Sequence, residues 1–258
     1  MPVDHFPSTH ATWIDAQLTI AERSRAAGDA AGEARAAGVL REYLMERYYD
    51  ALRTYVRSGA LVRAGEPDEI VGEFFARAVD APSMLGRWRE SGMPLRRWMM
   101  NAMAFHCRGM LRDRDRRERR EAALEIDADR APTVGTDAVR AFDRAWAIAL
   151  AGEAFGIAQR DADARGRPGD SMAFRMHSLD GLPHRTIARE LGITESASVN
   201  AVKRVSERMR EAVRELLRAE GVMAADMDAA VAEVLELVAE ASDEGGPGDS
   251  AMPGGVRP

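Results

Sequence analysis

The chain has 258 residues, a formal net charge of −6 and one cysteine, Cys107. A single cysteine excludes an internal disulfide and a cysteine-rich metal site. No apolar run approaches the roughly 20 residues that span a bilayer, and the start of the chain lacks the profile of a signal peptide, so we expect a cytoplasmic protein. Few β-branched or aromatic residues and abundant Ala, Arg, Glu and Leu predict an all-α fold.

The charge is distributed unevenly along the chain. Between Arg87 and Arg120 there are eleven arginines and four acidic residues, whereas 219–250 holds nine acidic residues and no basic one. A net negative charge speaks against nucleic-acid binding, but a chain polarised in this way has to be judged segment by segment. The arginine-rich segment is therefore a candidate nucleic-acid surface.

The N-terminal segment is weakly patterned, although 11–27 could form a helix. Over 39–57, apolar residues recur at three- and four-residue steps and predict an amphipathic helix. After a connection at 58–65, Pro67 suits the first turn of another helix, because its missing N–H is not needed there. We expect this helix to have a buried face and an acidic outer face. The buried residues are Ile70, Val71, Phe74, Phe75 and Ala78, and the outer ones are Asp68, Glu69 and Glu73.

The longest predicted helix, 94–121, follows an expected turn at 82–92. Its core side carries Leu95, Met99, Ala102, Met103, His106 and Met110, with Trp98 at the margin. Its far side carries Arg97, Asn101, Phe105, Arg108 and Arg112. An aromatic ring among guanidinium groups is suited to binding unstacked bases. The alternative is that Phe105 and Trp98 pack on a neighbouring helix and that the arginines form a solvated face with local ion pairs.

Residues 122–138 form an expected linker, since Pro132 and Gly135 interrupt any helical pattern. A second helical unit follows. Its first helix is marked by Phe142, Trp146, Ala149, Leu150 and Ile157, and it is followed by an expected loop at 161–170 and a short helix at 171–179. This order predicts two small helical units joined by a linker.

The stretch 182–217 is typical of two helices joined by a tight turn. Gly192 can adopt the left-handed backbone angles that end the first helix, and Thr194 is a suitable N-cap for the second. On the second helix we expect a buried stripe of Val199, Val202, Ser206, Met209, Val213 and Leu216, opposite Ser196, Asn200, Lys203, Arg204 and Glu207. This layout is typical of a helix that enters the DNA major groove, and the alternative is an αα-hairpin in a helical bundle.

Beyond Glu220, the apolar positions Met227, Val231, Val234, Leu235 and Val238 predict a further helix with an acidic outer face. Residues 244–258 are rich in Gly and Pro and are predicted to be disordered. Two roles stay open for the acidic helix. Either it packs its apolar stripe on the C-terminal unit and keeps its acids in water, or it covers the basic reading surface and restrains DNA binding.

The residues that catalysis or metal binding would need do not occur in a recognisable pattern. The five histidines lie at no metal-ligand spacing, and His106 is expected on the core side of its helix. The sequence contains no P-loop, no dinucleotide-binding glycine run and no nucleophile elbow. We therefore expect a protein that is not an enzyme and that uses no metal or cofactor.

Taken together, these segments resemble the sigma-70 family of bacterial RNA polymerase specificity subunits, in its compact extracytoplasmic-function group. PDEIVGEFFARA at 67–78 is similar to the region 2 helix that binds the polymerase clamp. PLRRWMMNAMAFHCRGMLRDRDRRER at 94–119 is similar to the promoter-melting helix, and the two helices of 182–217 are similar to the −35 reader of region 4. The resemblance implies an N-terminal extension at 1–37, a region 2-like helical bundle at 38–121, a linker at 122–138, a region 4-like helix-turn-helix domain at 139–218, and an acidic C-terminal helix and tail at 219–258.

The resemblance also implies a role for each candidate surface. The polymerase would be bound by Asp68, Glu69, Glu73 and the exposed part of Phe74, the −10 element by Arg97, Asn101, Phe105, Arg108 and Arg112, and the −35 element by Ser196, Ser198, Asn200, Lys203 and Arg204. The implied partners are core RNA polymerase, promoter DNA and, where one exists, an anti-sigma protein, with the free chain a monomer. Two alternatives stay open: a helical adaptor that binds polymerase or an anti-sigma protein without melting DNA, and a helix-turn-helix repressor, which would usually be a dimer.

Overall fold

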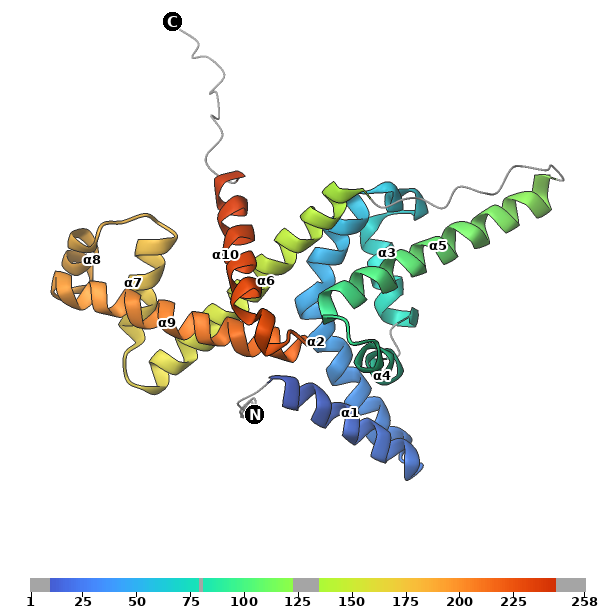
Figure 1. Cartoon of the computed structure of the whole chain (residues 1–258), viewed down its shortest axis with the longest axis horizontal. Helices are drawn as coiled ribbons and strands as arrows, with labels where there is room; N and C mark the ends of the chain where they lie inside the picture. The colour runs from blue at the N-terminus through green and yellow to red at the C-terminus, as the bar shows by residue number, and fades with distance from the viewer. Residues whose placement is uncertain (1–9, 79–80, 123–134, 245–258) are drawn as a thin grey trace, which may run out of the picture.

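The computed structural model describes residues 10–78, 81–122 and 135–244, which form helices joined by short connections (Figure 1). The α-helices are α1 (His10–Ala26), α2 (Ala30–Arg57), α3 (Pro67–Glu73), α4 (Ala81–Ser91), α5 (Leu95–Ala122), α6 (Thr136–Ala164), α7 (Pro168–Ser178), α8 (His184–Leu191), α9 (Glu195–Ala219) and α10 (Met227–Glu244). Short 3-10 helices lie at Ala60–Ala64 and Ala224–Asp226, and α3 continues into a π-helical turn at Phe74–Ala78. The predicted all-α class is confirmed, since these ranges contain no strand. None of the helices described there is long and apolar enough to cross a membrane.

Helix α2 is the central helix of the front half of the chain, which we define as α1–α5. Its N-cap is Asp29, whose carboxylate accepts a hydrogen bond from the backbone N–H of Gly32 at 2.9 Å. Most of the apolar stripe predicted for 39–57 is buried, and α1 packs along the first part of α2 (Figure 1). Because α2 begins at Ala30, the expected boundary between residues 37 and 38 falls inside a helix.

Helix α4 occupies the segment where the sequence predicted a turn, so that prediction was wrong. One face of α4 is apolar and is buried in the core. It carries Met84, Leu85 and Trp88, which share this face because Trp88 follows Leu85 by three positions and Met84 by four. The indole N–H of Trp88 donates to the carbonyl of Met93 at 2.7 Å, which fixes the chain as it leaves α4. Pro82 lies in the first turn of α4 and Gly92 follows its last residue with φ 67°, so these two residues mark the ends of a helix rather than a turn.

The loop predicted at 161–170 is also wrong. Helix α6 continues to Ala164 because Ala158 and Ala162 extend its buried face, and α7 begins at Pro168, where proline suits the first turn. The connection is therefore reduced to Arg165–Arg167. The predicted linker falls largely on 123–134, which lies outside the described residues, as do the tail at 245–258 and the N-terminal residues 1–9.

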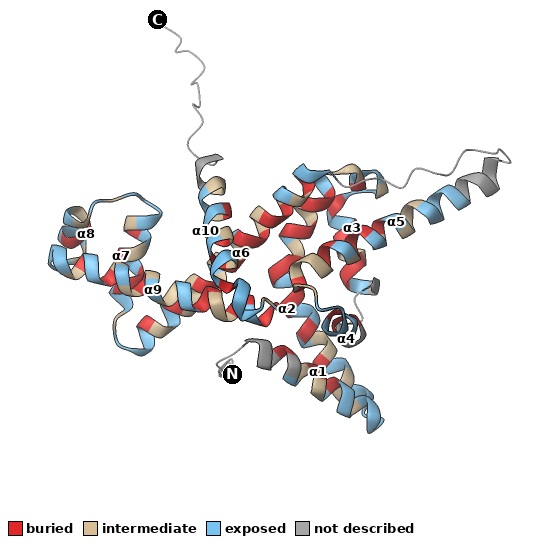
Figure 2. Ribbon diagram, viewed as in Figure 1, coloured by how far each residue is buried: buried red, intermediate tan, exposed pale blue. Residues whose placement is uncertain are grey.

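The main hydrophobic core of the described residues is one continuous cluster formed by α1–α6, the second half of α9 and α10 (Figure 2). It joins the front half to the rear half (α6–α10), most extensively where α2 packs against α6. A second, smaller cluster holds α7, α8 and the first part of α9 together, and consists of Ala173, Met176, Ile187 and Ala201 with Leu182, Leu191 and Val202 around them. The core is thus not divided at the expected linker, and the break in packing lies further along the chain, before the helix-turn-helix.

Helix α10 packs its apolar stripe on α6 and α9. The stripe consists of Met227, Val231, Val234 and Leu237, whereas Leu235, expected to be buried, is 52% exposed. Three of its carboxylates form ion pairs, Asp228 with Arg214, Glu233 with Arg96 and Glu240 with Arg140. None of these arginines lies on the predicted reading face of α9. The packing therefore agrees with a helix that packs its apolar stripe on the rear half, and not with a helix that covers the reading face.

Candidate nucleic-acid interface

Helix α5 presents the first candidate surface. Its core side repeats every four residues, with Leu95, Met99, Met103 and Cys107 fully buried. At about 100° per residue, the five residues predicted for the −10 element fall within about 80° of one another on the opposite side. All five side chains are exposed or half-buried, and the second half of α5 projects away from the rest of the described chain (Figure 1). The predicted face therefore exists as one continuous strip.

Phe105 decides between a surface for bases and a packing contact with a neighbouring helix, because its side chain is 68% exposed. The guanidinium of Arg112 lies over its ring, 5.9 Å from the centroid. The alternative that Phe105 packs on a neighbouring helix is therefore wrong. For Trp98 the same alternative is right, since its indole packs against the main core.

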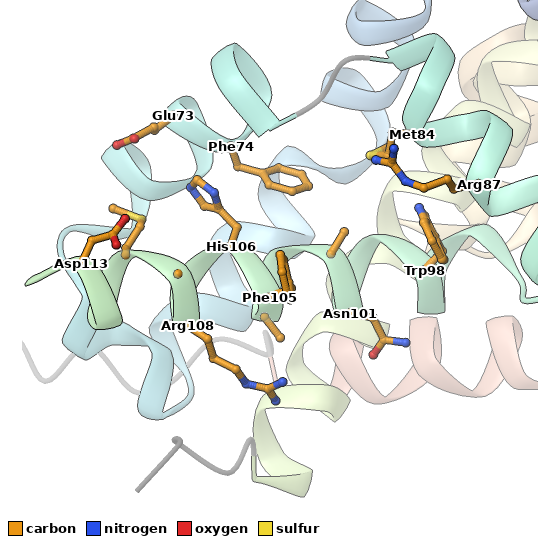
Figure 3. Close-up of a pocket in the computed structure, with 14 residues that line it drawn as sticks. Glu73, Phe74, Met84, Arg87, Trp98, Asn101, Phe105, His106, Arg108 and Asp113 are labelled. Carbon is orange, nitrogen blue, oxygen red and sulfur yellow. The ribbon is translucent and has the colours of Figure 1, made fainter. Parts of the chain in front are cut away.

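A groove of about 820 Å³ runs beside this strip, between α5, α4 and the end of α3 (Figure 3). Glu73 and Phe74 line it from the α3 side and Arg87 from α4. In Figure 3, Trp98 and His106 point from α5 toward these residues, whereas Asn101 and Arg108 point from the other side of α5. A flat apolar ligand could enter the groove while its charged part meets the arginines at the rim.

His106 forms part of the groove wall rather than a charged site. Its ring lies edge-on to Phe74, with the centroids 5.6 Å apart. Burial lowers the pKa of His106, and the nearby carboxylate of Glu73 acts in the opposite direction. The neutral imidazole is therefore favoured, which matches the expectation of a core-side histidine.

The acidic residues of α3 differ in how accessible they are. Asp68 and Glu69 are exposed, and Asp68 also interacts with Arg53 at 3.5 Å. Glu73 is half-buried at the groove. Phe74 is 1% exposed and packs edge-on against Phe75 with ring centroids 5.3 Å apart, on the buried face that the sequence predicted for this helix. The expectation that Phe74 presents part of its ring to a partner is wrong.

Arg97, at the start of the strip, is partly engaged inside the molecule. Its guanidinium lies 3.3 Å from the carboxylate of Asp143 on α6, and Arg96 lies 3.9 Å from the same carboxylate. Asp143 is buried, and burial raises the pKa of its carboxyl although both arginines oppose the shift. Arg97 is therefore less available to a phosphate than the other arginines of the strip.

The helix-turn-helix of α8 and α9 is the second candidate surface. Gly192 ends α8 in the left-handed conformation, with φ 66° and its N–H bonded to the carbonyl of Ala188. The Thr194 hydroxyl accepts a hydrogen bond from the N–H of Ala197 at 3.1 Å and caps α9. Both sequence predictions for this turn are confirmed.

The buried stripe of α9 is rotated from the predicted one in its first half. Ser198, Ala201 and Val205 are buried there, whereas Val199 is 43% exposed. Ser198 has no exposed surface and its hydroxyl lies 3.1 Å from Nδ1 of His184, so assigning it to DNA binding was wrong. Small side chains are buried at these positions because α7 and α8 approach α9 closely there.

The remaining predicted residues of α9 divide into two groups. Ser196, Asn200 and Lys203 are exposed on one face near the start of the helix. Arg204 instead donates two hydrogen bonds to Asp170 of α7, at 2.8 and 2.9 Å, and these bonds raise the pKa of Arg204. Arg204 therefore braces α9 against α7 and is a weaker candidate for base contact.

Sequence reasoning missed two basic residues, Arg185 and Arg189, which are exposed on α8. In helix-turn-helix proteins the first helix of the pair crosses the phosphate backbone, so exposed basic residues there are the signal that could have identified them. The helix-turn-helix and the projecting end of α5 lie at opposite ends of the longest axis of the structure (Figure 1).

The part of the chain that the structure describes contains no group of three or more His, Cys, Asp or Glu residues that could hold a metal ion. What the described surfaces offer is two cationic faces, one with an exposed aromatic ring and one on a helix-turn-helix. No protein-family model matches the chain, and neither the curated proteins nor the solved structures include one that is significantly similar to it.

Proposed function

We propose that this protein is a sigma factor that binds core RNA polymerase in the cytoplasm and directs it to a subset of promoters. The observation that carries the proposal is the exposure of Phe105 on a strip shared with Asn101 and Arg108. An exposed aromatic ring at such a position has no role in packing the core. It is well suited to stacking on a base that has left the duplex.

In this proposal the strip on α5 holds the −10 element after it has been opened. Stacking a base on an aromatic ring contributes roughly 1–3 kcal/mol, which is comparable to the few kcal/mol needed to unstack one base step. Arg108 and Arg112 supply charge for the phosphates, and Asn101 can form hydrogen bonds with base edges. The balance of these energies means that opening also depends on the polymerase.

The helix-turn-helix would bind the −35 element as a duplex. Ser196, Asn200 and Lys203 can approach base edges in the major groove, and Arg185 and Arg189 can bind the flanking phosphates. Asp68 and Glu69 would meet a basic surface of the polymerase. Exposed charges of this kind mainly set the rate and orientation of encounter.

A second candidate function is the helical adaptor, and the packing between the two halves of the chain favours it. A sigma factor has to place its two DNA-binding faces on separate promoter elements, whereas the described halves share one core and a buried ion pair between Arg47 and Glu220. Under the sigma-factor proposal, either the two faces reach their elements from opposite ends of the molecule or the halves separate when polymerase binds. The adaptor needs no such opening.

Run-off transcription with purified core polymerase and a promoter library tests both candidates. A sigma factor yields specific transcripts, and Phe105→Ala should lower them roughly 5- to 150-fold on duplex templates but much less on templates with a pre-melted −10 region. Ile148→Ala, which truncates an apolar side chain 51% exposed on α6, is the matched control and should change little. Polymerase binding without any transcript would support the adaptor.

Charge reversal tests the docking surface separately. Asp68→Lys with Glu69→Lys should weaken the affinity for core polymerase, while Glu236→Lys on the exposed side of α10 should not. Unchanged affinity would contradict the docking assignment. A dimeric mass in solution with a symmetric DNA footprint would favour the repressor instead.

A further inference from the structure

Val199 is an aliphatic residue in an unexpected place. Its position in the sequence predicted that it would be buried, but it is 43% exposed on the first turns of α9. The small core between α7, α8 and α9 is completed by Ala201 and Val202 instead. Val199 therefore does not have to be there for the helix-turn-helix to fold.

The neighbours of Val199 place it on the edge of the face that would enter the major groove. At about 100° per residue, Val199 lies about 60° from Ser196 and about 40° from Lys203 around the helix axis. Arg204 lies on the other edge of this face and is held by Asp170. The centre of the face is therefore polar. One of its edges is Arg204, which is bound to Asp170, and the other is Val199, which is apolar and exposed.

An apolar group on a reading helix has few partners in the major groove. Guanine, cytosine and adenine present hydrogen-bond donors and acceptors there, whereas thymine adds a C5-methyl group. The same methyl group is found on 5-methylcytosine. An exposed valine next to polar and basic side chains can therefore recognise a feature that its neighbours cannot.

We infer that Val199 is a specificity-determining residue that contacts the C5-methyl group of a pyrimidine in the duplex bound by α9. This inference rests on the proposed binding of the −35 element. In this arrangement Lys203 and the arginines of α8 supply affinity that does not depend on sequence, and Val199 contributes to the choice of one base pair.

The test uses the full-length chain and a duplex selected from a random library for binding to it. Each thymine of the selected duplex is replaced in turn by deoxyuridine, which removes only the methyl group. At one position we expect the replacement to weaken wild-type binding roughly three- to fivefold, the factor that corresponds to the burial of one methylene-sized group. If no thymine responds, each cytosine is replaced by 5-methylcytosine, and a gain of the same size at one position identifies that base as the source of the methyl group.

Two variants connect the effect to Val199. Val199→Ala should bind the methylated and unmethylated duplexes equally, whereas Val199→Ile should keep the difference. Val62→Ala, which truncates a valine 45% exposed in the 3-10 helix Ala60–Ala64, is the matched control and should behave as wild type. Circular dichroism confirms that each variant is folded.

Three outcomes overturn the inference. If no base responds to its methyl group, or if Val199→Ala keeps the full difference, Val199 does not read a methyl group although the chain binds a specific duplex. If the library yields no preferred duplex, the proposed −35 recognition fails and the inference fails with it. The first two results contradict only the role of Val199 and leave the proposed function intact. Failure of the inference can therefore be distinguished from failure of the proposed function.

Discussion

Arg47 of α2 and Glu220 at the end of α9 form a buried ion pair, with Nη1 2.9 Å from Oε1, although they are 173 positions apart in the chain. Glu153 of α6 also binds Arg47, and the indole N–H of Trp146 donates to Glu220 at 3.3 Å. The backbone carbonyl of Glu220 accepts a hydrogen bond from Leu95, the first residue of α5, at 2.8 Å. Burial disfavours the charge on Arg47, but the neighbouring Tyr43, Glu153 and Glu220 act in the opposite direction and raise its pKa. Glu220 thus connects four helices of the two halves.

Replacing Arg47 by alanine should lower the free energy of unfolding by about 3–5 kcal/mol, because it leaves the buried Glu220 carboxylate without a counter-charge. Urea unfolding measures the loss. Arg116→Ala is the matched control, since Arg116 pairs with Asp113 on the exposed part of α5, and it should cost at most about 1 kcal/mol. A similarly small loss for Arg47→Ala would mean that the pair is hydrated or replaceable and that the halves are held together by apolar packing alone.

Asp143→Asn should strengthen non-specific DNA binding without reducing stability at pH 7. Burial raises the pKa of Asp143, so its charged form is disfavoured in the folded protein, and removing that charge releases Arg97 from an internal ion pair. Because the folded state binds the proton more tightly, the Asp143 carboxyl adds to the free energy of unfolding as the pH falls from neutral toward 3.8, so over this range the free energy of unfolding of the wild type should increase relative to that of the variant. Fluorescence anisotropy and urea unfolding give the two readouts. Weaker DNA binding by the variant would show that the pair orients Arg97 rather than withholding it.

His106 should make the protein less stable in mild acid. Since burial lowers its pKa below the usual 6.5, the unfolded chain takes up a proton before the folded chain does. The contribution of His106 to the free energy of unfolding should therefore decline as the pH falls below 6.5 and level off once the pH is below the folded-state pKa, with a slope of at most about 1.4 kcal/mol per pH unit. In His106→Gln this part of the pH dependence should be absent, while the variant and the wild type should show the same slope near pH 8. An unchanged slope below pH 6.5 would place the responsible group elsewhere.

Lys203→Ala and Arg204→Ala should differ although the two residues are adjacent. Lys203 is exposed, so its loss should weaken duplex binding and reduce the dependence of the logarithm of affinity on the logarithm of salt concentration by about one unit, without affecting the fold. Arg204→Ala also removes the two hydrogen bonds to Asp170 and should lower the thermal unfolding midpoint as well. Anisotropy over a range of salt concentrations, combined with thermal unfolding, separates these effects. If Lys203→Ala leaves the salt dependence unchanged, the binding face lies elsewhere.

Local patterns were sufficient for much of the fold. The four-residue repeat of α5 follows directly from its sequence, and the left-handed Gly192 and the Thr194 cap are properties of those residue types. The exposed side of α5 could also be predicted, because a helix that buries one side must present the other. These features depend on interactions within a few residues of one another.

Features that depend on contacts between distant segments could not be predicted in the same way. Helix α4 replaced a predicted turn because Met84, Leu85 and Trp88 find an apolar partner surface in the main core. The register of α9 shifted because α7 and α8 approach the side that carries Ser198 and Ala201. The spacing of its segment places Phe74 on the buried side of the helix, but only the packing of Phe75 and His106 against its ring leaves none of that ring exposed to a partner.

By itself the sequence determined that the chain is helical, where α5, α8 and α9 lie and which side of α5 carries the arginines, because these properties follow from helical periodicity and from local capping. The tertiary structure alone decided which of the candidate residues are accessible. Arg97 and Arg204 are engaged by Asp143 and Asp170, and Ser198 is covered by α8, through contacts between residues at least 14 positions apart. It also decided that the front and rear halves share one core, since the burial of Arg47 with Glu220 requires α2 and α9 to meet.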